Sequence, residues 1–293
     1  MYDKLKNIIA MVIFGSIGFF VRFIPLQSSV IALSRASIGG VFLLLLMLVI
    51  GEKISFSALK KNWLVLLLSG IALGFNWMLL FEAYKHTSVA NATLYYYLAP
   101  VIITFLSPII FKERLTLIRI ASIILSLAGM AFISGPEILS VGSHGALGVA
   151  FGVGAACLYA TVVILNKHLK SISAYERTAA QLIVAALSML PYCLMTGAFG
   201  GIVFDPLVYI FVCIVGIVHT GVAYALYFGS IGKLTSQTVA LLAYIDPVLA
   251  LFVSWRLLGE EFTLSGLIGA VLILGSMIVC EVVEGKDAKG TQK

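Results

Sequence analysis

A carboxylate and an imidazole lie inside two long apolar segments near the end of the chain. Asp246 directly precedes Pro247 within the segment 234–257, and His219 lies within the segment 206–229. If these segments cross a membrane, such side chains are costly there and are expected to face a cavity or a partner. The proline removes a backbone donor and frees a carbonyl beside the carboxylate. This chemistry suits proton coupling or the recognition of an amine.

Asp246 and His219 are predicted to share one depth in the membrane. The turn between the two segments centres near Gly232, 13 residues after His219 and 14 before Asp246. Residues equidistant from a short turn lie side by side in an antiparallel helix pair. We therefore expect the two side chains to meet and to be candidates for proton coupling. The alternative is a neutral histidine hydrogen-bonded within the bundle and a protonated aspartate that binds the free carbonyl.

The first half of the chain offers a similar set of polar and aromatic residues. By the same reasoning about the turn near His86, Asn76 lies level with Tyr95–Tyr97. Tyrosine supplies an aromatic wall with a hydroxyl at its tip. Successive helical residues lie about 100° apart, so three consecutive tyrosines cannot all face one cavity. The expected substrate-binding residues are Asn76, Trp77, Tyr95, Tyr96, Tyr97, His219, Tyr244 and Asp246.

Two further charges lie toward the ends of apolar segments. Arg35 and Glu82 are expected to form an ion pair that gates the outer side of the protein. The alternative is that such side chains extend to the membrane surface with their apolar stems buried.

The elements that must position these residues are membrane helices. The sequence is 61% hydrophobic and 11% charged, whereas soluble domains carry about 25% charged residues. A helix needs about 20 apolar residues to cross a bilayer, and the alternation typical of barrel strands is missing. The sequence therefore predicts an all-α membrane protein with ten transmembrane helices. They are expected at 8–25, 29–50, 63–84, 88–111, 115–134, 145–166, 174–197, 206–229, 234–257 and 263–283.

The basic residues predict the orientation. With the N-terminus in the cytoplasm, the outer loops hold only Arg22, Arg35, Lys85 and Arg256, so 15 of the 19 lysines and arginines lie inside. Lysine and arginine concentrate in cytoplasmic loops. We expect a multi-pass protein of the plasma (cell inner) membrane, with both termini cytoplasmic and the first segment retained rather than cleaved as a signal peptide.

The chain matches itself when it is shifted by 147 positions. Tyr97-Leu98-Ala99-Pro100-Val101 falls on Tyr244-Ile245-Asp246-Pro247-Val248, and Glu113 falls on Glu260. Phe14-Gly15 pairs with Tyr159-Ala160 after small gaps. Each half holds five spans, and because five is odd the second half must enter the membrane from the opposite side. The sequence predicts two inverted five-helix repeats, residues 1–140 and 141–293, with a substrate site where they meet.

The segments that carry this repeat resemble the EamA-type repeat of the drug/metabolite transporter superfamily. They run from Ala99-Pro100-Val101 to Lys112-Glu113 and from Asp246-Pro247-Val248 to Gly259-Glu260; Lys112 stands where many repeats have glycine. The resemblance implies alternating access around a cavity lined mainly by the third, fourth, eighth and ninth helices. It also implies transport of amino acids, other metabolites, sugar conjugates or amines, often as export.

The sequence gives little support to other classes of function. The four histidines form no H-E-x-x-H motif, and the cysteines lie in apolar spans at no metal-ligand spacing, so no metal or cofactor is expected. We expect a secondary transporter that exports amino acids or related compounds, with protons as a candidate coupling ion. Uptake or exchange of a cationic amine is the alternative, and a membrane enzyme or a pore is a distant one. The expected partners are a small molecule and the lipid bilayer, not nucleic acid; a monomer is expected, with a dimer left open.

Overall fold

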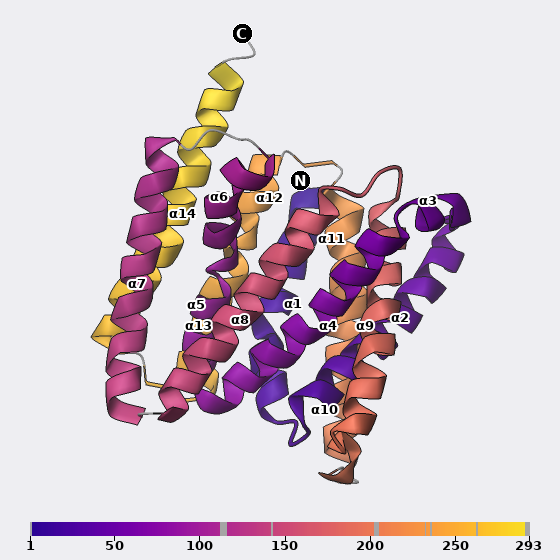
Figure 1. Ribbon diagram of the computed structural model, residues 1–293, viewed down its shortest axis with the longest axis horizontal. Helices are drawn as coiled ribbons and strands as arrows, with labels where there is room; N and C mark the ends of the chain where they lie inside the picture. Colours follow the sequence, from indigo (N-terminus) through magenta and orange to yellow (C-terminus); the bar gives the residue numbers. More distant parts are fainter. Residues whose placement is uncertain are drawn as a thin grey trace.

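The computed structural model describes residues 2–111, 116–141, 143–201, 205–231, 233–234, 236–261 and 263–290. Every regular element in these ranges is helical (Figure 1). The elements are α1 (Tyr2–Arg22), α2 (Ser28–Ile50), α3 (Phe56–Lys61), α4 (Trp63–His86), α5 (Val89–Tyr96), α6 (Ala99–Phe111), α7 (Leu117–Val141), α8 (Ser143–Asn166), α9 (Ala174–Met195), η1 (Ala198–Gly201), α10 (Pro206–Gly216), η2 (Ile217–Val222), α11 (Ala223–Ile231), α12 (Ser236–Ala243), α13 (Ile245–Leu257) and α14 (Leu264–Gly290). Glu113, which marks the first copy of the repeat, lies outside the described residues.

The predicted all-α membrane class is confirmed. Seven helical segments within the described ranges are long and apolar enough to cross a membrane, and the apolar helices Leu117–Ile133 and Leu264–Cys280 are shorter. Large apolar side chains cover the outside of the bundle; Leu48 is 75% exposed and Leu187 65%. A surface of this kind is stable against lipid rather than water.

Local sequence signals set the ends of the helices. The Ser88 hydroxyl accepts a hydrogen bond from the Asn91 N–H at the start of α5, and Ser173 does the same for Glu176 at the start of α9. Such caps satisfy backbone donors that the first helical turn leaves free. At the end of α2, Gly51 has a φ of 74°, a left-handed conformation that glycine adopts without strain.

Two helices are interrupted inside the bundle, each next to a proline. The break between α5 and α6 comes just before Pro100, and the break between α12 and α13 comes just before Pro247. Proline cannot donate to the carbonyl four residues earlier, so the backbone loses a helical hydrogen bond there. For Pro247 that carbonyl belongs to Ala243. A third irregularity is η2, a π-helical turn between α10 and α11.

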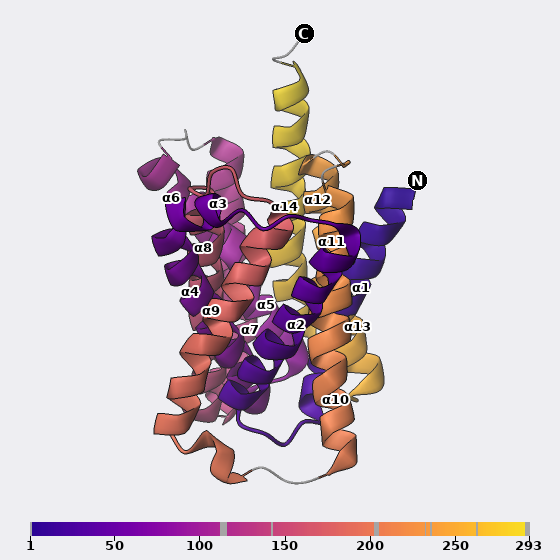
Figure 2. The ribbon, with the colours of Figure 1, turned by 90° about the vertical axis from the view of Figure 1, so that its right-hand side faces the viewer.

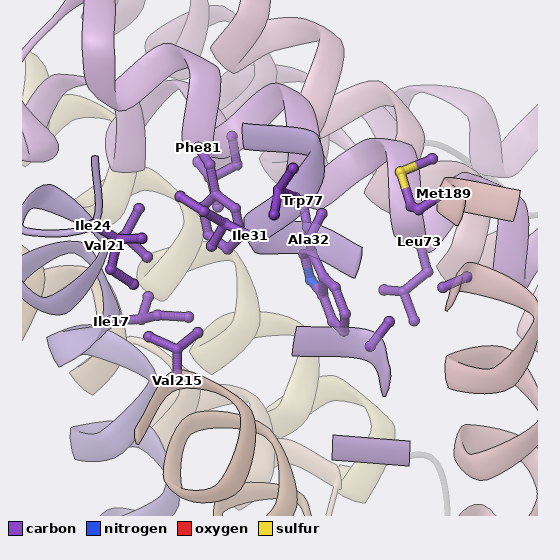
Figure 3. Packing of buried hydrophobic residues seen from close by; sticks show 14 of the residues in the cluster. Ile17, Val21, Ile24, Ile31, Ala32, Leu73, Trp77, Phe81, Met189 and Val215 are labelled. Carbon is purple, nitrogen blue, oxygen red and sulfur yellow. The ribbon is translucent and has the colours of Figure 1, made fainter. Parts of the chain in front are cut away.

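The helices form one elongated bundle in which α1 begins and α14 ends at the same end (Figures 1 and 2). We call the opposite end, where α1 ends and α2 and α5 begin, the distal end. At one edge α7 packs along α14, while α4 packs against α8 and α9. Figure 3 shows the core between α1, α2, α4 and α10, where Val21, Ile31, Trp77 and Val215 come together.

Candidate functional site

A cavity of about 250 Å³ lies between the interrupted helices and their neighbours. Its described wall comes mostly from α4, from α5 and α6, and from α12 and α13, with contributions from α1, α2, α8 and α11. The residues are Phe14, Gly15, Ile17, Arg35, Leu73, Trp77, Leu80, Tyr84, Thr93, Tyr96, Tyr97, Ala99, Pro100, Tyr159, Tyr224, Ala243, Asp246 and Ala250. A liquid water occupies about 30 Å³, so the space suits a solute of about eight to ten non-hydrogen atoms.

Arg35 of α2 brings a positive charge to this cavity. Only 6% of the residue is exposed. Its Nε donates a hydrogen bond to the Thr220 hydroxyl at 2.9 Å, and its guanidinium carbon lies 4.0 Å from the centre of the Trp77 ring. The Thr220 hydroxyl in turn donates to the carbonyl of Val215, five residues earlier in the π-helical turn, at 3.1 Å. The guanidinium is therefore held by a hydrogen-bond chain on one side and an aromatic face on another.

Asp246 of α13 brings the opposite charge. Close to its carboxyl group lies the Tyr97 hydroxyl, which donates to the carbonyl oxygen of Ala243 at 3.4 Å. That carbonyl is the one released by Pro247. A carboxylate, a tyrosine hydroxyl and a proline-freed carbonyl are thus present on one side of the cavity. Arg35 and Asp246 interact electrostatically, but no ion pair within 4 Å joins these two described residues.

Aromatic rings from several helices form another part of the wall. Tyr96 lies 5.3 Å from Tyr159 of α8, and Phe14 of α1 lies 5.4 Å from Tyr224 of α11. Rings at these separations pack favourably. The site therefore combines an apolar, aromatic enclosure with one cation and one acid, an arrangement typical of binding sites for small organic molecules.

The structure brings together four of the eight predicted binding residues, namely Trp77, Tyr96, Tyr97 and Asp246. Three others lie elsewhere. The Asn76 amide donates to the carbonyl of Ala155 at 2.6 Å, so it serves the contact between α4 and α8. Tyr95 is fully buried against α8, and Tyr244 is the N-cap residue of α13 and packs against a cluster of buried residues that includes Ile273 of α14. These three residues are not among those that line the cavity, because helix position sets the depth of a side chain but not its direction.

The expected meeting of His219 with Asp246 does not occur. The Nε2 of His219 lies 3.1 Å from the Ser16 hydroxyl, its Nδ1 lies 3.3 Å from the carbonyl oxygen of Ile214, and its ring packs on Phe20 at 4.8 Å. Both ring nitrogens therefore have partners in the wall between α1 and the π-helical turn. The geometry matches the alternative of a histidine that is hydrogen-bonded within the bundle.

The expected ion pair of Arg35 with Glu82 is also not formed. The Glu82 carboxylate accepts from the Ser28 hydroxyl at 2.6 Å and pairs with Lys85 at 3.2 Å. It lies 3.5 Å from His86 as well. Arg35 instead points toward Thr220 and the cavity, because the close approach of α2 to the π-helical turn offers its guanidinium a nearer acceptor.

A different carboxylate connects the two halves of the chain at the distal end. Glu260, just before α14, accepts a hydrogen bond from the Val89 N–H at 2.9 Å and one from the Ser254 hydroxyl. Arg22 lies 3.9 Å from Glu260 and also donates to the carbonyl of Tyr84. A carboxylate at the first N–H of α5 is favourable because that end of a helix carries a partial positive charge.

Sequence reasoning assigned Arg35 to an outer gate rather than to the cavity, and it did not assign four aromatic residues to the cavity wall, namely Phe14, Tyr84, Tyr159 and Tyr224. Arg35 is an arginine within an apolar helix, and this alone signals a functional site. Phe14 and Tyr159 are mates in the internal repeat, so a wall shared by both halves would include them as a pair. Among the described residues no group of three or more histidine, cysteine, aspartate or glutamate side chains could hold a metal ion.

The fold and the cavity define the class, a polytopic α-helical membrane protein that encloses a site of small-molecule size. Comparison with known families is more specific. The profile described as "EamA-like transporter family" matches twice in succession, over residues 5–135 and 146–280. The chain belongs to this family and is a membrane transporter.

Proteins of similar sequence are also described as transporters. The "Uncharacterized transporter YxxF" of Bacillus subtilis is 32% identical over 274 residues, which cover 93% of this chain and 87% of that protein. An "Uncharacterized transporter" of Archaeoglobus fulgidus is 29% identical over 67% of this chain and 68% of its own. The "Uncharacterized inner membrane transporter YicL" of Salmonella typhimurium is 24% identical over 97% of each chain. These names point to a transporter rather than an enzyme.

A solved crystal structure has the same fold. It superposes with a TM-score of 0.68 at 19% sequence identity and covers 96% of this chain and 98% of that chain. The helical arrangement is therefore found over nearly the full length of both proteins.

Proposed function

We propose that this protein is a secondary transporter that carries a small amino acid or a related metabolite through the central cavity. The observation that carries the proposal is the 250 Å³ site between the helices, whose described wall holds Arg35 and Asp246 among aromatic rings. A solute in this space would lie between the membrane helices. Transport then requires the helices to open the site to one side of the membrane at a time.

The proposal includes two inverted five-helix repeats, residues 1–140 and 141–293. In a pair of units related by a twofold axis, a contact of one helix with another implies a second contact with the roles exchanged. Three pairs of helix contacts follow this rule. The contact of α4 with α8 is matched by that of α11 with α1, and the contact of α1 with α13 is matched by that of α8 with α6. The contact of α4 with α9 is matched by that of α10 with α2. This symmetry supports ten membrane crossings, with α5–α6, α10–α11 and α12–α13 each counted as one.

Contacts between individual residues support the same twofold relation between the two halves. The Ser122 hydroxyl of α7 donates to the carbonyl of Ser276 of α14 at 3.0 Å. In the internal repeat of 147 residues, Ser122 corresponds to Gly269 and Ser276 corresponds to Gly129. These two glycines are also close together, because a methyl group placed on Gly129 would lie 2.8 Å from the carbonyl oxygen of Gly269. Contacts between α7 and α14 thus recur with the two halves exchanged.

We further propose that the termini are cytoplasmic and that the protein lies in the plasma membrane. The start of α1 and the end of α14 share one end of the bundle, and the basic residues gather in the loops that this orientation places inside. The distal end would then face outward. Cysteine labelling of the two tails in intact and permeabilised cells tests this orientation, and tails on opposite sides would refute it.

Asp246 is the proposed site of proton coupling. It lines the cavity together with Tyr97, whereas His219 is not among the lining residues. The direct test is flux of candidate amino acids into proteoliposomes with and without a pH gradient. Asp246→Asn is expected to abolish the response to the gradient, while the control Asp205→Asn, an exposed helix cap that asparagine replaces well, should retain it. Undiminished gradient-driven flux in Asp246→Asn would remove this role.

The carboxylate and the tyrosines also fit the alternative, the uptake or exchange of a cationic amine. Negative and aromatic groups together bind alkylammonium ions well. The positive charge of Arg35 in the same cavity helps to decide between an amino acid and a cationic amine as the substrate.

A further inference from the structure

Arg35 has hydrogen-bonding capacity that the protein leaves unused. Of its three nitrogen atoms, Nε donates to the Thr220 hydroxyl, and no hydrogen bond joins either terminal nitrogen to another residue that the structure describes. The residue is 94% buried and lines the cavity, so its unused donors face the cavity. A largely buried guanidinium with unused donors facing a cavity is a favourable site for an anion.

The contacts around Arg35 fix the orientation of its guanidinium, so that the two terminal nitrogens lie side by side with their N–H groups unused. Thr220 fixes the Nε edge, and Trp77 covers one face of the group at 4.0 Å. Phe81 lies at 5.9 Å from the guanidinium carbon. The edge that remains is the one with two parallel N–H donors, which matches the two oxygens of a carboxylate.

We infer that Arg35 is the carboxylate-binding residue of the cavity, so that the transported compound must carry a carboxylate group. This inference rests on the proposed transport function and makes it more specific. Asp246, across the cavity and not paired with Arg35 within 4 Å, then accepts a positively charged amine of the same solute. A lone amine would satisfy Asp246 but would leave Arg35 uncompensated, which disfavours the cationic amine as substrate.

A matched series of four compounds tests the inference with the wild-type protein. L-leucine has both groups, 3-methylbutylamine lacks the carboxylate, 4-methylpentanoate lacks the amine, and L-leucine methyl ester keeps the shape but removes the negative charge. Trp77 lies under Arg35 and can report binding by fluorescence once Trp63 and Trp255, both more than half exposed, are replaced by phenylalanine. L-leucine and 4-methylpentanoate are expected to bind about 10- to 100-fold more tightly than the amine and the ester.

Variants separate recognition from stability. Arg35→Gln should reduce the affinity for L-leucine by about 10- to 100-fold and leave that for 3-methylbutylamine unchanged or improved. Arg35→Lys keeps the charge but loses the two parallel N–H donors, so it should recover only part of the affinity. The control is Arg256→Gln, because Arg256 is exposed on α13 and lies outside the cavity.

The outcomes distinguish this inference from the transport proposal. Equal binding of the amine, the ester and L-leucine, or binding of none of the four, would overturn the role of Arg35 even if Arg35→Gln does not fold. Flux of 3-methylbutylamine without flux of L-leucine would also overturn it and leave transport standing. Arg35-dependent binding of L-leucine without flux above protein-free liposomes would support the binding site and refute the transport proposal.

Discussion

Gly15 marks the place where α1 approaches α13 most closely beside the cavity. A methyl group on this residue would lie 2.5 Å from the carbonyl oxygen of Asp246 and 3.0 Å from the Cβ of Leu249. Ordinary contact begins at 3.4 Å, so Gly15→Ala must separate the two backbones by about 0.9 Å. The obstacle is the main chain of α13 rather than a flexible side chain. The substitution therefore displaces Asp246 itself.

The energetic size of this change can be isolated with a second glycine. Gly275 of α14 has no heavy atom within 4 Å of the position that a methyl group would take. Both substitutions gain about 1 kcal/mol of helix propensity, but only Gly15→Ala adds the cost of overpacking, about 1–3 kcal/mol. We expect Gly15→Ala to unfold in detergent at a temperature about 2–10 °C below that of Gly275→Ala.

Transport should respond more strongly than stability. A displacement of about 1 Å at a binding site can cost up to about 100-fold in function, so the flux of Gly15→Ala should fall at least about tenfold, with Gly275→Ala close to wild type. Thermal unfolding followed by fluorescence and proteoliposome flux measure the two effects. Equal melting temperatures and equal flux for the two variants would refute the close packing of α1 on α13.

Three further substitutions test the site and its surroundings. Tyr97→Phe removes the hydroxyl that donates to the Ala243 carbonyl beside Asp246, a hydrogen bond worth about 0.5–1.5 kcal/mol; we expect several-fold weaker substrate binding in a fluorescence titration, and an unchanged affinity would speak against a role of this hydroxyl in the site. Glu260→Gln keeps an acceptor at the start of α5 but loses the charge that faces Arg22, so the melting temperature should fall by only a few degrees, and the salt dependence of that temperature should weaken. Asn76→Leu removes a buried hydrogen bond between helices at a cost of about 1–3 kcal/mol; thermal unfolding should detect the loss, whereas a change in the order of substrate preference would show that Asn76 reaches the cavity after all.

Seven of the ten predicted spans coincide with described helical segments that are long and apolar enough to cross a membrane, because these apolar runs are long and their ends carry clear signals. The expected segment 29–50 corresponds to α2 at Ser28–Ile50, and the expected 206–229 begins at the same Pro206 as α10. Asp246 lines the cavity; the sequence singles it out because a carboxylate beside a proline in an apolar run has few stable environments, and its role there stays a prediction.

The direction of individual side chains was the part that sequence could not supply. Counting residues from a turn places His219 and Asp246 at one depth, but the π-helical turn η2 contains His219 and shifts the helix phase there. Adjacent helical residues differ by about 100° in direction, which separates Asn76 from Trp77 and Tyr95 from Tyr96. Arg35 was assigned to the outer gate from its position along α2, although its long side chain reaches Thr220 on another helix.

The π-helical turn also affects how the cavity responds to a change in chain length. A π turn holds one residue more than an α turn, and such turns are frequent at functional sites. Deleting one residue within Ile217–Val222 would replace the wide turn by regular α turns and would leave the direction of α11 unchanged. Deleting one residue from α10 instead would rotate α11 by about 100° relative to the start of α10 and would take Tyr224 out of the cavity wall. The wide turn thus absorbs a change in chain length that would reshape the pocket if it fell one or two turns earlier.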